Sequence, residues 1–307
     1  MQIWHIYAVS IVAGFFTAFQ YPAYSAAVTT MLSAEDYTRA SGMLGASRAL
    51  SGILAPIFAA ALLIPLGIRG VMLIDLATFL IAFVTLLAIP IPQPQLSEAG
   101  KQSRGTFWQE FRFGFQYIYK KQSLRALTLL FMLAGVFLAI GATLMAPLVL
   151  SKTGDSEAAL ATVQSTGAIG GIVGGVILSL WGGMKKRIRN VLIGGVGACL
   201  LGILWLGLGK MVIFWAIGSF FFAFFEPFVE GGNIAIWQVQ VPADVQGRVF
   251  SARHLLVQIP YLFGILISGY LAEASTIPLV MIVAGIAGAL VFLAGSSVPS
   301  LNVESNV

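Results

Sequence analysis

The chain contains almost no cysteine and few charges. Cys199 is the single cysteine among 307 residues, which excludes an internal disulfide framework and a metal site built from several thiolates. The two histidines, His5 and His254, lie far apart in the sequence and form no metal-binding spacing. Charged residues make up 9% of the chain and hydrophobic residues 58%, which places it outside the range of soluble globular domains.

Long apolar runs account for this composition. A helix needs about 20 apolar residues to cross the hydrocarbon core of a bilayer, whereas membrane β-strands are shorter and alternate in polarity. We therefore predict an all-α polytopic membrane protein with nine transmembrane helices, at residues 3–31, 40–64, 70–90, 125–150, 158–181, 191–208, 211–237, 249–272 and 277–297.

The basic residues gather in alternate gaps between these runs. Most of the 17 lysines and arginines follow the first, third, fifth or seventh run. By the positive-inside rule these gaps are cytoplasmic, which places the N-terminus outside and the C-terminus inside. No signal peptide accounts for an outside N-terminus, so we expect further helices upstream of Met1. Confinement of the charge to loops argues against nucleic acid as a partner.

Two helix ends, six runs apart, look alike. Phe19-Gln20-Tyr21-Pro22 is followed by Arg39-Ala40-Ser41, and Phe225-Glu226-Pro227 is followed by Gly247-Arg248-Val249. Chance similarity between apolar sequences is the alternative. If the repeat is real, its unit is six helices, residues 125–297 form a complete C-terminal bundle, and residues 1–90 are the last three helices of an N-terminal bundle.

The one long hydrophilic stretch, residues 91–124, separates these bundles and is predicted to be a cytoplasmic linker. Between Phe107 and Tyr119 the apolar residues recur at helical intervals, with basic residues beside them. This pattern favours an amphipathic helix on the inner membrane face. The alternative is that the stretch simply begins the helix at 125–150. Residues 298–307 are predicted to be a cytoplasmic tail.

Several short motifs resemble those of one transporter family. Two six-helix units joined by a cytoplasmic linker are the layout of the major facilitator superfamily. The stretches that carry the resemblance are Phe19 to Ala27 with Arg39 to Gly42, Gly70 to Asp75, Trp181 to Arg187, and Trp237 to Ser251. They are similar to the bacterial drug and siderophore exporters, with the enterobactin-exporter and macrolide-efflux branch nearest. The resemblance implies that this chain corresponds to family helices 4–12, without the first three.

The resemblance extends, in degenerate form, to the antiporter motif of the family's fifth helix. Gly42 and Pro56 fit the motif, whereas other small residues replace its remaining glycines. A second set of small residues, which includes Gly167, Gly171 and Gly175, has the spacing of helix–helix packing.

Ionisable residues within the apolar runs are candidates for proton coupling, because they are costly to bury there. Glu226 and Glu230 lie four residues apart on one helix face. Two carboxylates in a poorly solvated cavity resist joint ionisation, so one is expected to hold a proton. The alternative is a wetted position near the inner helix end, or pairing with Arg248 or Arg253. Asp75 is a further candidate, with pairing to Arg69 as its alternative.

Polar and aromatic residues within the runs are candidates for a substrate cavity, because exporters of amphipathic compounds place such groups in apolar surroundings. They are Gln20, Tyr21, Tyr24, Asn233, Gln258 and Tyr261. A cytoplasmic gate is predicted from loop charges, with Asp36/Arg39 and Asp244/Arg248 as salt-bridge latches. Arg253 is assigned to the same gate, as is Arg48, which otherwise snorkels to the cytoplasm or binds an anionic group.

The favoured function is a proton-coupled exporter of small hydrophobic or amphipathic molecules in the bacterial inner membrane, working by alternating access. Its expected partners are a small-molecule substrate, protons or another ion, and membrane lipid. The sequence contains no nucleotide-binding loop, and we expect no cofactor, no metal and no enzymatic activity. The alternatives are a lipid or lysophospholipid flippase on the same fold, and a truncated remnant that does not transport.

Overall fold

The computed structural model describes residues 3–90, 92, 97–102 and 105–301, and every regular element within these ranges is a helix. The helices are α1 (Ile3–Met31), α2 (Tyr37–Ala88), α3 (Glu98–Gln102), α4 (Phe107–Lys120), α5 (Gln122–Thr153), α6 (Glu157–Trp181), α7 (Arg187–Gly197), the π-helix η1 (Ala198–Leu204), α8 (Trp205–Leu208), α9 (Val212–Gln240), α10 (Gln246–Ala274) and α11 (Ile277–Ser296), with 3-10 turns η2 (Ala243–Val245) and η3 (Pro299–Leu301).

Seven helical segments are long and apolar enough to cross a membrane in the described part of the chain. Six of them correspond to the predicted runs between residues 125 and 297, with α7, η1 and α8 forming one span. The seventh, Ala61–Ala88, overlaps the predicted run at 70–90 and ends two residues before it. The runs at 3–31 and 40–64 are helical as well, and their passage through the membrane stays a prediction.

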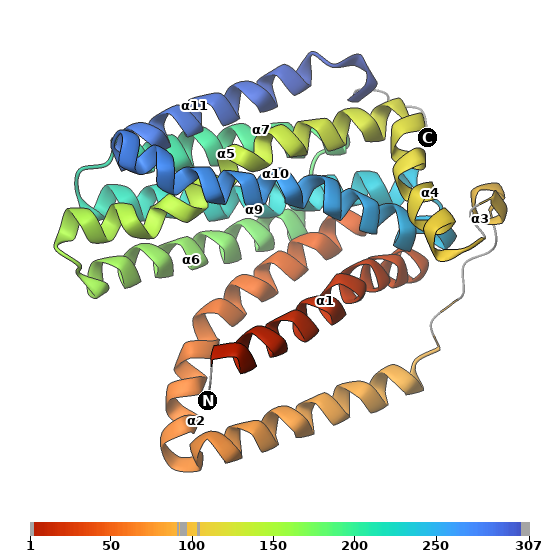
Figure 1. The fold of residues 1–307 in the computed structure, drawn as a ribbon, viewed down its shortest axis with the longest axis horizontal. Helices are drawn as coiled ribbons and strands as arrows, with labels where there is room; N and C mark the ends of the chain where they lie inside the picture. The colour runs from red at the N-terminus through yellow and green to blue at the C-terminus, as the bar shows by residue number, and fades with distance from the viewer. Residues whose placement is uncertain (1–2, 91, 93–96, 103–104, 302–307) are drawn as a thin grey trace.

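The predicted break between the runs at 40–64 and 70–90 is present in the structure. The two runs form the two limbs of α2, which together span 52 residues and reverse direction at Gly67, inside the predicted gap (Figure 1). Gly67 has φ 61° and ψ 178°, a conformation that only glycine adopts readily. The helical hydrogen bonding resumes directly after it, so no loop of polar residues marks the reversal.

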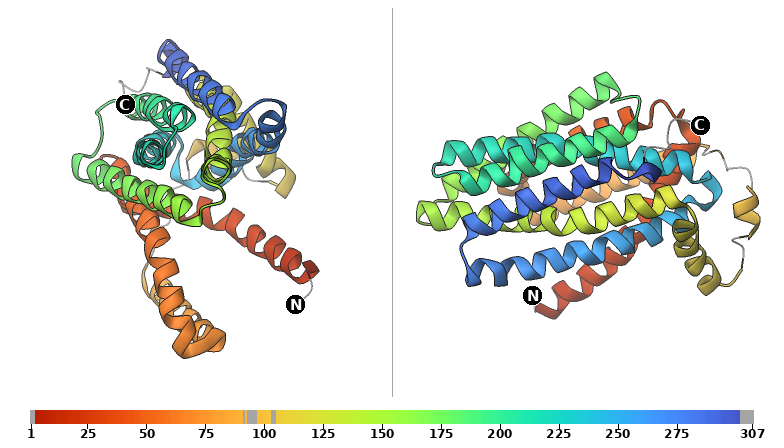
Figure 2. Two further views of the ribbon diagram at one scale, coloured as in Figure 1. Left: turned by 90° about the vertical axis from the view of Figure 1, so that its left-hand side faces the viewer. Right: turned by 90° about the horizontal axis from the view of Figure 1, so that it is seen from above.

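Helices α5 to α11 form a bundle, and α1 and α2 lean against one side of it (Figures 1 and 2). Within the bundle α6 and α7 pack on α9, while α5 packs on α10 and α11. The first limb of α2 packs on α6 and α9, and α1 packs on α10. The second limb, Ala61–Ala88, stands apart from the bundle, and none of its most apolar stretch is buried.

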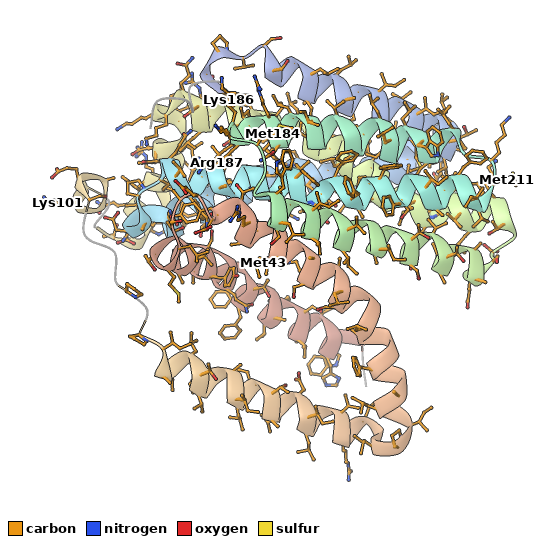
Figure 3. The ribbon with its side chains drawn as sticks, turned by 180° about the vertical axis from the view of Figure 1, so that it is seen from behind. Met43, Lys101, Met184, Lys186, Arg187 and Met211 are labelled. Carbon is orange, nitrogen blue, oxygen red and sulfur yellow. The ribbon has the colours of Figure 1, made fainter. Side chains whose placement is uncertain are left out.

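The α1–α2 turn, the linker helices and residues 182–186 lie at one end of the molecule, here called the basic end. Lys101, Lys186 and Arg187 lie toward this end, and Met211 lies at the opposite one (Figure 3). The contacts of α1 and α2 with the bundle include the η2 turn and the 182–183 segment, both of which lie at the basic end. Helices α1 and α2, here called the first half, therefore meet the bundle of α5 to α11, here called the second half, at the basic end.

Glycines allow α2 to approach α6 closely. A Cβ atom added to Gly175 would lie 2.6 Å from the backbone nitrogen of Ala46 and 2.8 Å from the carbonyl oxygen of Gly42. A Cβ atom on Gly42 would meet the backbone of residues 175–179 at 2.8–3.2 Å. The other predicted packing glycines, Gly167 and Gly171, face Ser219 on α9 and Ala49 on α2. The glycines of α6 thus allow this helix to pack closely between α2 of the first half and α9 of its own half.

The linker contains the predicted amphipathic helix. Helix α4 begins at a capping box between Thr106 and Gln109 and ends before Lys121, whose backbone is extended (φ −89°, ψ 109°). This residue separates α4 from α5, so the stretch is not merely the start of α5. Helix α4 crosses the basic end of the bundle steeply (Figure 1). The predicted tail at 298–307 lies largely outside the described residues.

Replacing Gly175 with leucine is expected to lower thermal stability. The new side chain meets the backbone of α2, and overpacking of this kind costs about 1–3 kcal/mol. The measurement is the temperature at which half of the detergent-solubilised protein leaves the monodisperse peak. Gly52→Leu on α2 is the matched control, because nothing lies within 4 Å of a Cβ at that position. Equal losses in the two variants would contradict the close approach of α2 and α6.

Candidate functional site

Glu226 stands at the middle of the membrane span. It is the central residue of α9, which has 29 residues, so about 21 Å of helix separates it from either end. The aromatic rings of Phe221, Phe224, Phe225 and Phe228 contact one another along the same stretch of helix, in stacked and tilted pairs. Among the described residues Glu226 has no hydrogen bond and no ion pair within 4 Å. This carboxyl group is therefore placed far from both ends of its helix, with no counter-ion in contact.

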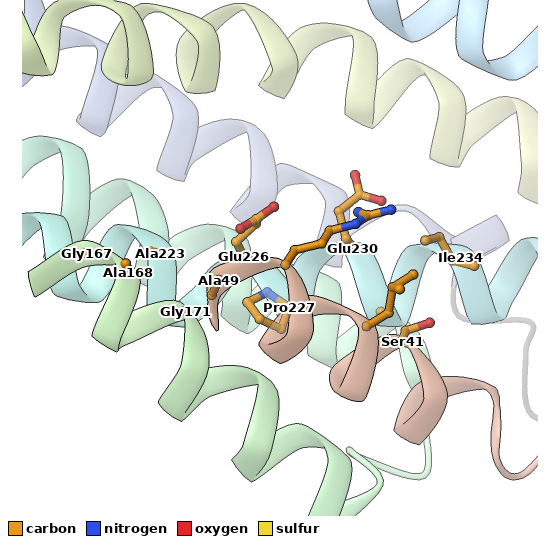
Figure 4. A pocket seen from close by; sticks show the side chains of 14 residues that line it. Ser41, Ala49, Gly167, Ala168, Gly171, Ala223, Glu226, Pro227, Glu230 and Ile234 are labelled. Atoms are coloured by element: carbon orange, nitrogen blue, oxygen red, sulfur yellow. The ribbon is translucent and has the colours of Figure 1, made fainter. Parts of the chain in front are cut away.

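The Glu226 side chain is exposed to a cavity between α2, α6 and α9. The cavity measures about 290 Å³, and Figure 4 shows Glu226 and Glu230 on its α9 wall. Its remaining walls consist mostly of small and apolar residues, with Arg48 as the one basic residue among those that line it: Ser41, Leu44, Gly45, Arg48, Ala49, Gly167, Ala168, Gly171, Ala223, Gly231 and Ile234. Glu226 and Glu230 of the second half and Arg48 of the first half therefore line the same small cavity.

Arg48 also lines a second and larger cavity. This space of about 630 Å³ lies between α1 and the two limbs of α2, and its walls include Gln20, Tyr24 and Leu86. Leu44 and Arg48 line both cavities, so they form the boundary between them. Arg48 lies about three turns inside α2. Two predicted cavity residues and one predicted gate residue thus come together.

The two glutamates have different surroundings. Glu230 lies 3.9 Å from the guanidinium of Arg253, measured between Oε2 and Nη2. Arg253 in turn lies over the ring of Trp237, 5.4 Å from its centre. Both partners belong to the second half, so this ion pair does not change when the halves separate. The predicted alternative of pairing with Arg253 applies to Glu230, whereas Glu226 is left with Arg48 as the nearest cation lining its cavity.

The structure brings some predicted cavity residues to the site and leaves others away from it. Tyr261 on α10 lies within electrostatic range of Glu226. Asn233 is fully buried, its Oδ1 accepts a hydrogen bond from Trp237 Nε1, and it lines neither cavity. Gln258 is half-buried and lines neither cavity. Asp75 is exposed on the second limb of α2, outside both cavities.

Two predicted residues cannot be placed in this way. Tyr21 and Pro56 lie within α1 and α2, but their side chains are outside the described part of the structure.

The expected latches at the basic end form with other partners. Asp244 accepts hydrogen bonds from the backbone nitrogen and the hydroxyl of Ser97, both at 2.8 Å, instead of pairing with Arg248. Arg248 pairs with Glu110 on α4, with Nε and Oε2 2.9 Å apart. Asp244 lies in the η2 turn, and from there its carboxylate reaches Ser97, the residue before α3, whose hydroxyl also accepts a hydrogen bond from the backbone nitrogen of Gly100 at 3.0 Å. These contacts fasten the linker to the second half.

Contacts between the halves at the basic end are mostly uncharged. Asp36 accepts a hydrogen bond from Ser33 within its own turn, 2.7 Å long, rather than pairing with Arg39. Arg39 lies against Gly182 of the second half. Arg187 donates to the carbonyl oxygen of Ala34 at 2.9 Å, and Gln238 donates to the carbonyl oxygen of Ser25 at 3.4 Å. Few hydrogen bonds hold this closure, so it can open at small cost.

The residues that sequence reasoning missed here are Ser25, Ser97 and Glu110. Their partners lie more than one hundred positions away in the chain, at separations of 213, 147 and 138 residues. Glu110 sits on the amphipathic helix, and its acidic character among basic neighbours is the one signal that singles it out.

Comparison with known proteins places the chain in one family. The family described as Major Facilitator Superfamily matches residues 1–265. Macrolide efflux protein A of Streptococcus pyogenes is 24% identical over 279 residues, which cover 89% of this chain and 67% of that protein. Macrolide efflux protein A of Enterococcus faecalis is 25% identical over 256 residues, covering 82% of this chain and 77% of that protein. The similarity thus extends over nearly the whole chain.

The linker contact is expected to weaken in acid. The hydrogen bond from Arg248, and then its charge, hold the pKa of the Glu110 carboxyl below its ordinary value of 4.5. Because the folded pKa is lowered, the stabilisation is complete above 4.5 and is lost as the pH falls through the lowered value. A half-exposed pair of this kind contributes at most about 1 kcal/mol.

The check is thermal stability of the wild type and of Glu110→Gln across this acidic range. The variant should be slightly less stable at neutral pH, and the two curves should converge in acid. Glu98→Gln serves as control, because that carboxylate is paired with Lys101 on the exposed surface of the linker. Curves that stay parallel down to the lowest pH would exclude the Glu110–Arg248 contact.

Proposed function

Because this chain belongs to the major facilitator superfamily, a family of membrane transporters rather than enzymes, we propose that it is a proton-driven exporter of small amphipathic molecules. It is a multi-pass protein of the bacterial cell membrane, related to efflux proteins. Protons moving inward supply the driving force, and alternating access of a central cavity moves the substrate outward.

The observation that carries this proposal is Glu226 facing Arg48 across the two halves. A carboxyl group in the middle of the membrane, without a counter-ion in contact, can take up and lose a proton at moderate energetic cost. In its charged form Glu226 attracts Arg48 and draws α9 toward α2, which favours closure at the basic end. In its protonated form this attraction is lost, and the basic end opens more easily. The proton state of one residue thereby sets the relative energies of the two conformations.

The orientation of the chain gives this cycle its direction. The predicted arrangement has nine membrane spans, with residue 1 outside, the C-terminus inside and the basic end in the cytoplasm. The gathering of the basic turns at one end of the structure supports it. A proton taken up from outside converts the closed basic end into an open one, and its release into the cytoplasm prepares Glu226 for closure around a substrate.

The cavity of about 630 Å³ supports the substrate class. Its volume lies within the range of small-molecule sites, and its walls are apolar apart from Thr17, Gln20, Tyr24 and Arg48. Such a surface suits a molecule with a large apolar body and a few polar groups. The relatives named for macrolide efflux act on compounds of this description, so a macrolide is the first substrate to test. The lipid-flippase alternative predicts transport of a labelled phospholipid in the same vesicles.

Replacing Glu226 with glutamine is expected to abolish transport driven by a pH gradient. Glutamine retains the shape of the side chain but cannot exchange a proton or attract Arg48. The measurement is macrolide uptake by inside-out vesicles with an imposed pH gradient, which should fall to the level of protein-free vesicles. Glu230→Gln is expected to lose only part of the rate, since Glu230 has its own partner in Arg253. Glu157→Gln, exposed at the start of α6, is the control and should match the wild type. Full gradient-driven uptake by the Glu226 variant would refute the proposal.

Arg48 provides a separate test of the attraction between the halves. Arg48→Lys keeps the positive charge and should keep most of the pH-driven rate, whereas Arg48→Gln should lose most of it. Uptake is measured in the same vesicles, with binding of the macrolide in the absence of a gradient as a second readout. If both substitutions reduce transport and binding equally, Arg48 acts by shaping the cavity and not through its charge.

A further inference from the structure

A groove at the basic end lies on the outer surface of the bundle, away from the central cavities. It measures about 580 Å³ and runs between α4, the first turns of α5, and α10. Phe115, Ile118, Leu129, Met132 and Leu256 form its apolar walls. Leu129 and the next lipid-facing residue one turn on, Leu133, are both more than half exposed, so the apolar surface continues from the groove along α5.

Three cations stand along this groove. Arg112 and Lys120 are exposed on α4, and the half-buried Arg125 begins α5. Arg125 lies over the ring of Tyr119 at 5.3 Å and donates to its carbonyl oxygen at 3.5 Å. No carboxylate pairs with any of the three in the described part of the chain. Glu110, which shares α4 with Arg112 and Lys120, is held by Arg248.

The groove lies at the level where a bilayer changes from headgroups to hydrocarbon. Helix α4 is amphipathic and crosses the end of the bundle, and the apolar span of α5 begins directly after it. Trp108 and Tyr119 are exposed to 73% and 70% on α4, as expected of aromatic residues at a membrane interface. The cations are therefore placed at headgroup depth, with the apolar walls beneath them.

We propose that this groove is a binding site for an anionic phospholipid of the inner leaflet. The lipid phosphate lies among Arg112, Lys120 and Arg125, because arginine and lysine are the side chains that pair with phosphate. One acyl chain lies against Phe115, Leu129 and Met132 and leaves along α5. Three unpaired cations above an apolar groove complement both parts of such a molecule, whereas a soluble anion would use the cations alone.

The site joins elements that the transport cycle has to keep together. Helix α4 packs on α10 with Gly114 against the backbone of Arg248, and Lys121 and Tyr117 donate to the carbonyl oxygen of Gln240 at the end of α9. A lipid in the groove adds a further bond between the linker and the second half. Binding is thus expected to stabilise the linker on the bundle.

The test is native mass spectrometry of the whole purified chain with phosphatidylglycerol and with phosphatidylcholine. The wild type is expected to bind phosphatidylglycerol at least about tenfold more tightly, because the three cations attract its net negative charge, which phosphatidylcholine lacks. The triple variant R112Q/K120Q/R125Q should lose this preference. Leu129→Trp fills the groove but leaves the cations in place, and it should weaken binding of both lipids.

A charge-matched control separates the site from general attraction. K101Q/K185Q/K186Q removes three exposed cations from the same end of the molecule and should keep the lipid preference. An equal loss in this control would overturn the proposal, as would unchanged lipid binding by Leu129→Trp. Displacement of phosphatidylglycerol by inorganic phosphate would also overturn it, because it would identify the cations as a site for soluble anions.

Discussion

The close approach of α2 to α6 is the constraint on which the rest of the arrangement depends. Gly42 and Gly175 bring two backbones into contact where any side chain would hold them apart. This crossing fixes the depth of Arg48 and directs it to the cavity in which Glu226 lies. Helix α6 also packs on the backbone of α9 at Gly170 and Gly174. Its glycines on two faces therefore position both α2, which carries Arg48, and α9, which carries Glu226. Van der Waals packing of small residues, rather than the hydrophobic effect, provides such contacts in a bilayer.

The charged groups fall into two sets, those that have partners within one half or the linker and those that face each other across the two halves. Glu230 with Arg253, Glu110 with Arg248, and Asp244 with Ser97 all lie within the second half or join it to the linker. They do not have to break when the halves separate. Glu226 and Arg48 lie on opposite halves and are not in direct contact. An attraction across a low-dielectric cavity acts over several ångströms, so it can respond to a proton without a bond being formed or broken.

Much of the fold follows from hydropathy, whereas the pairing of residues does not. The apolar runs between residues 125 and 297 and the amphipathic helix at 107–120 were predictable, because burial in lipid imposes their length and period. The reversal at Gly67 lies in the predicted gap between two runs, but its form was not predictable, because a single glycine replaces the polar loop that usually marks a reversal. Glu226 was identifiable as a charge in an apolar run. Its relation to Arg48 was not, nor were the partners of Asp244 and Arg248, because these depend on packing between distant segments.

The central claim is that the proton state of Glu226 controls closure at the basic end. Spin labels at Leu32 and Lys185, which are exposed on opposite halves at that end, report this distance by pulsed electron resonance, with buried Cys199 left in place. The account predicts one short distance in mildly alkaline buffer and a growing longer component in mildly acidic buffer. With Glu226→Gln the longer component should be present at every pH. The account would be contradicted if the wild-type distance did not change with pH. It would also be contradicted if the distance in the Glu226→Gln variant changed with pH as it does in the wild type.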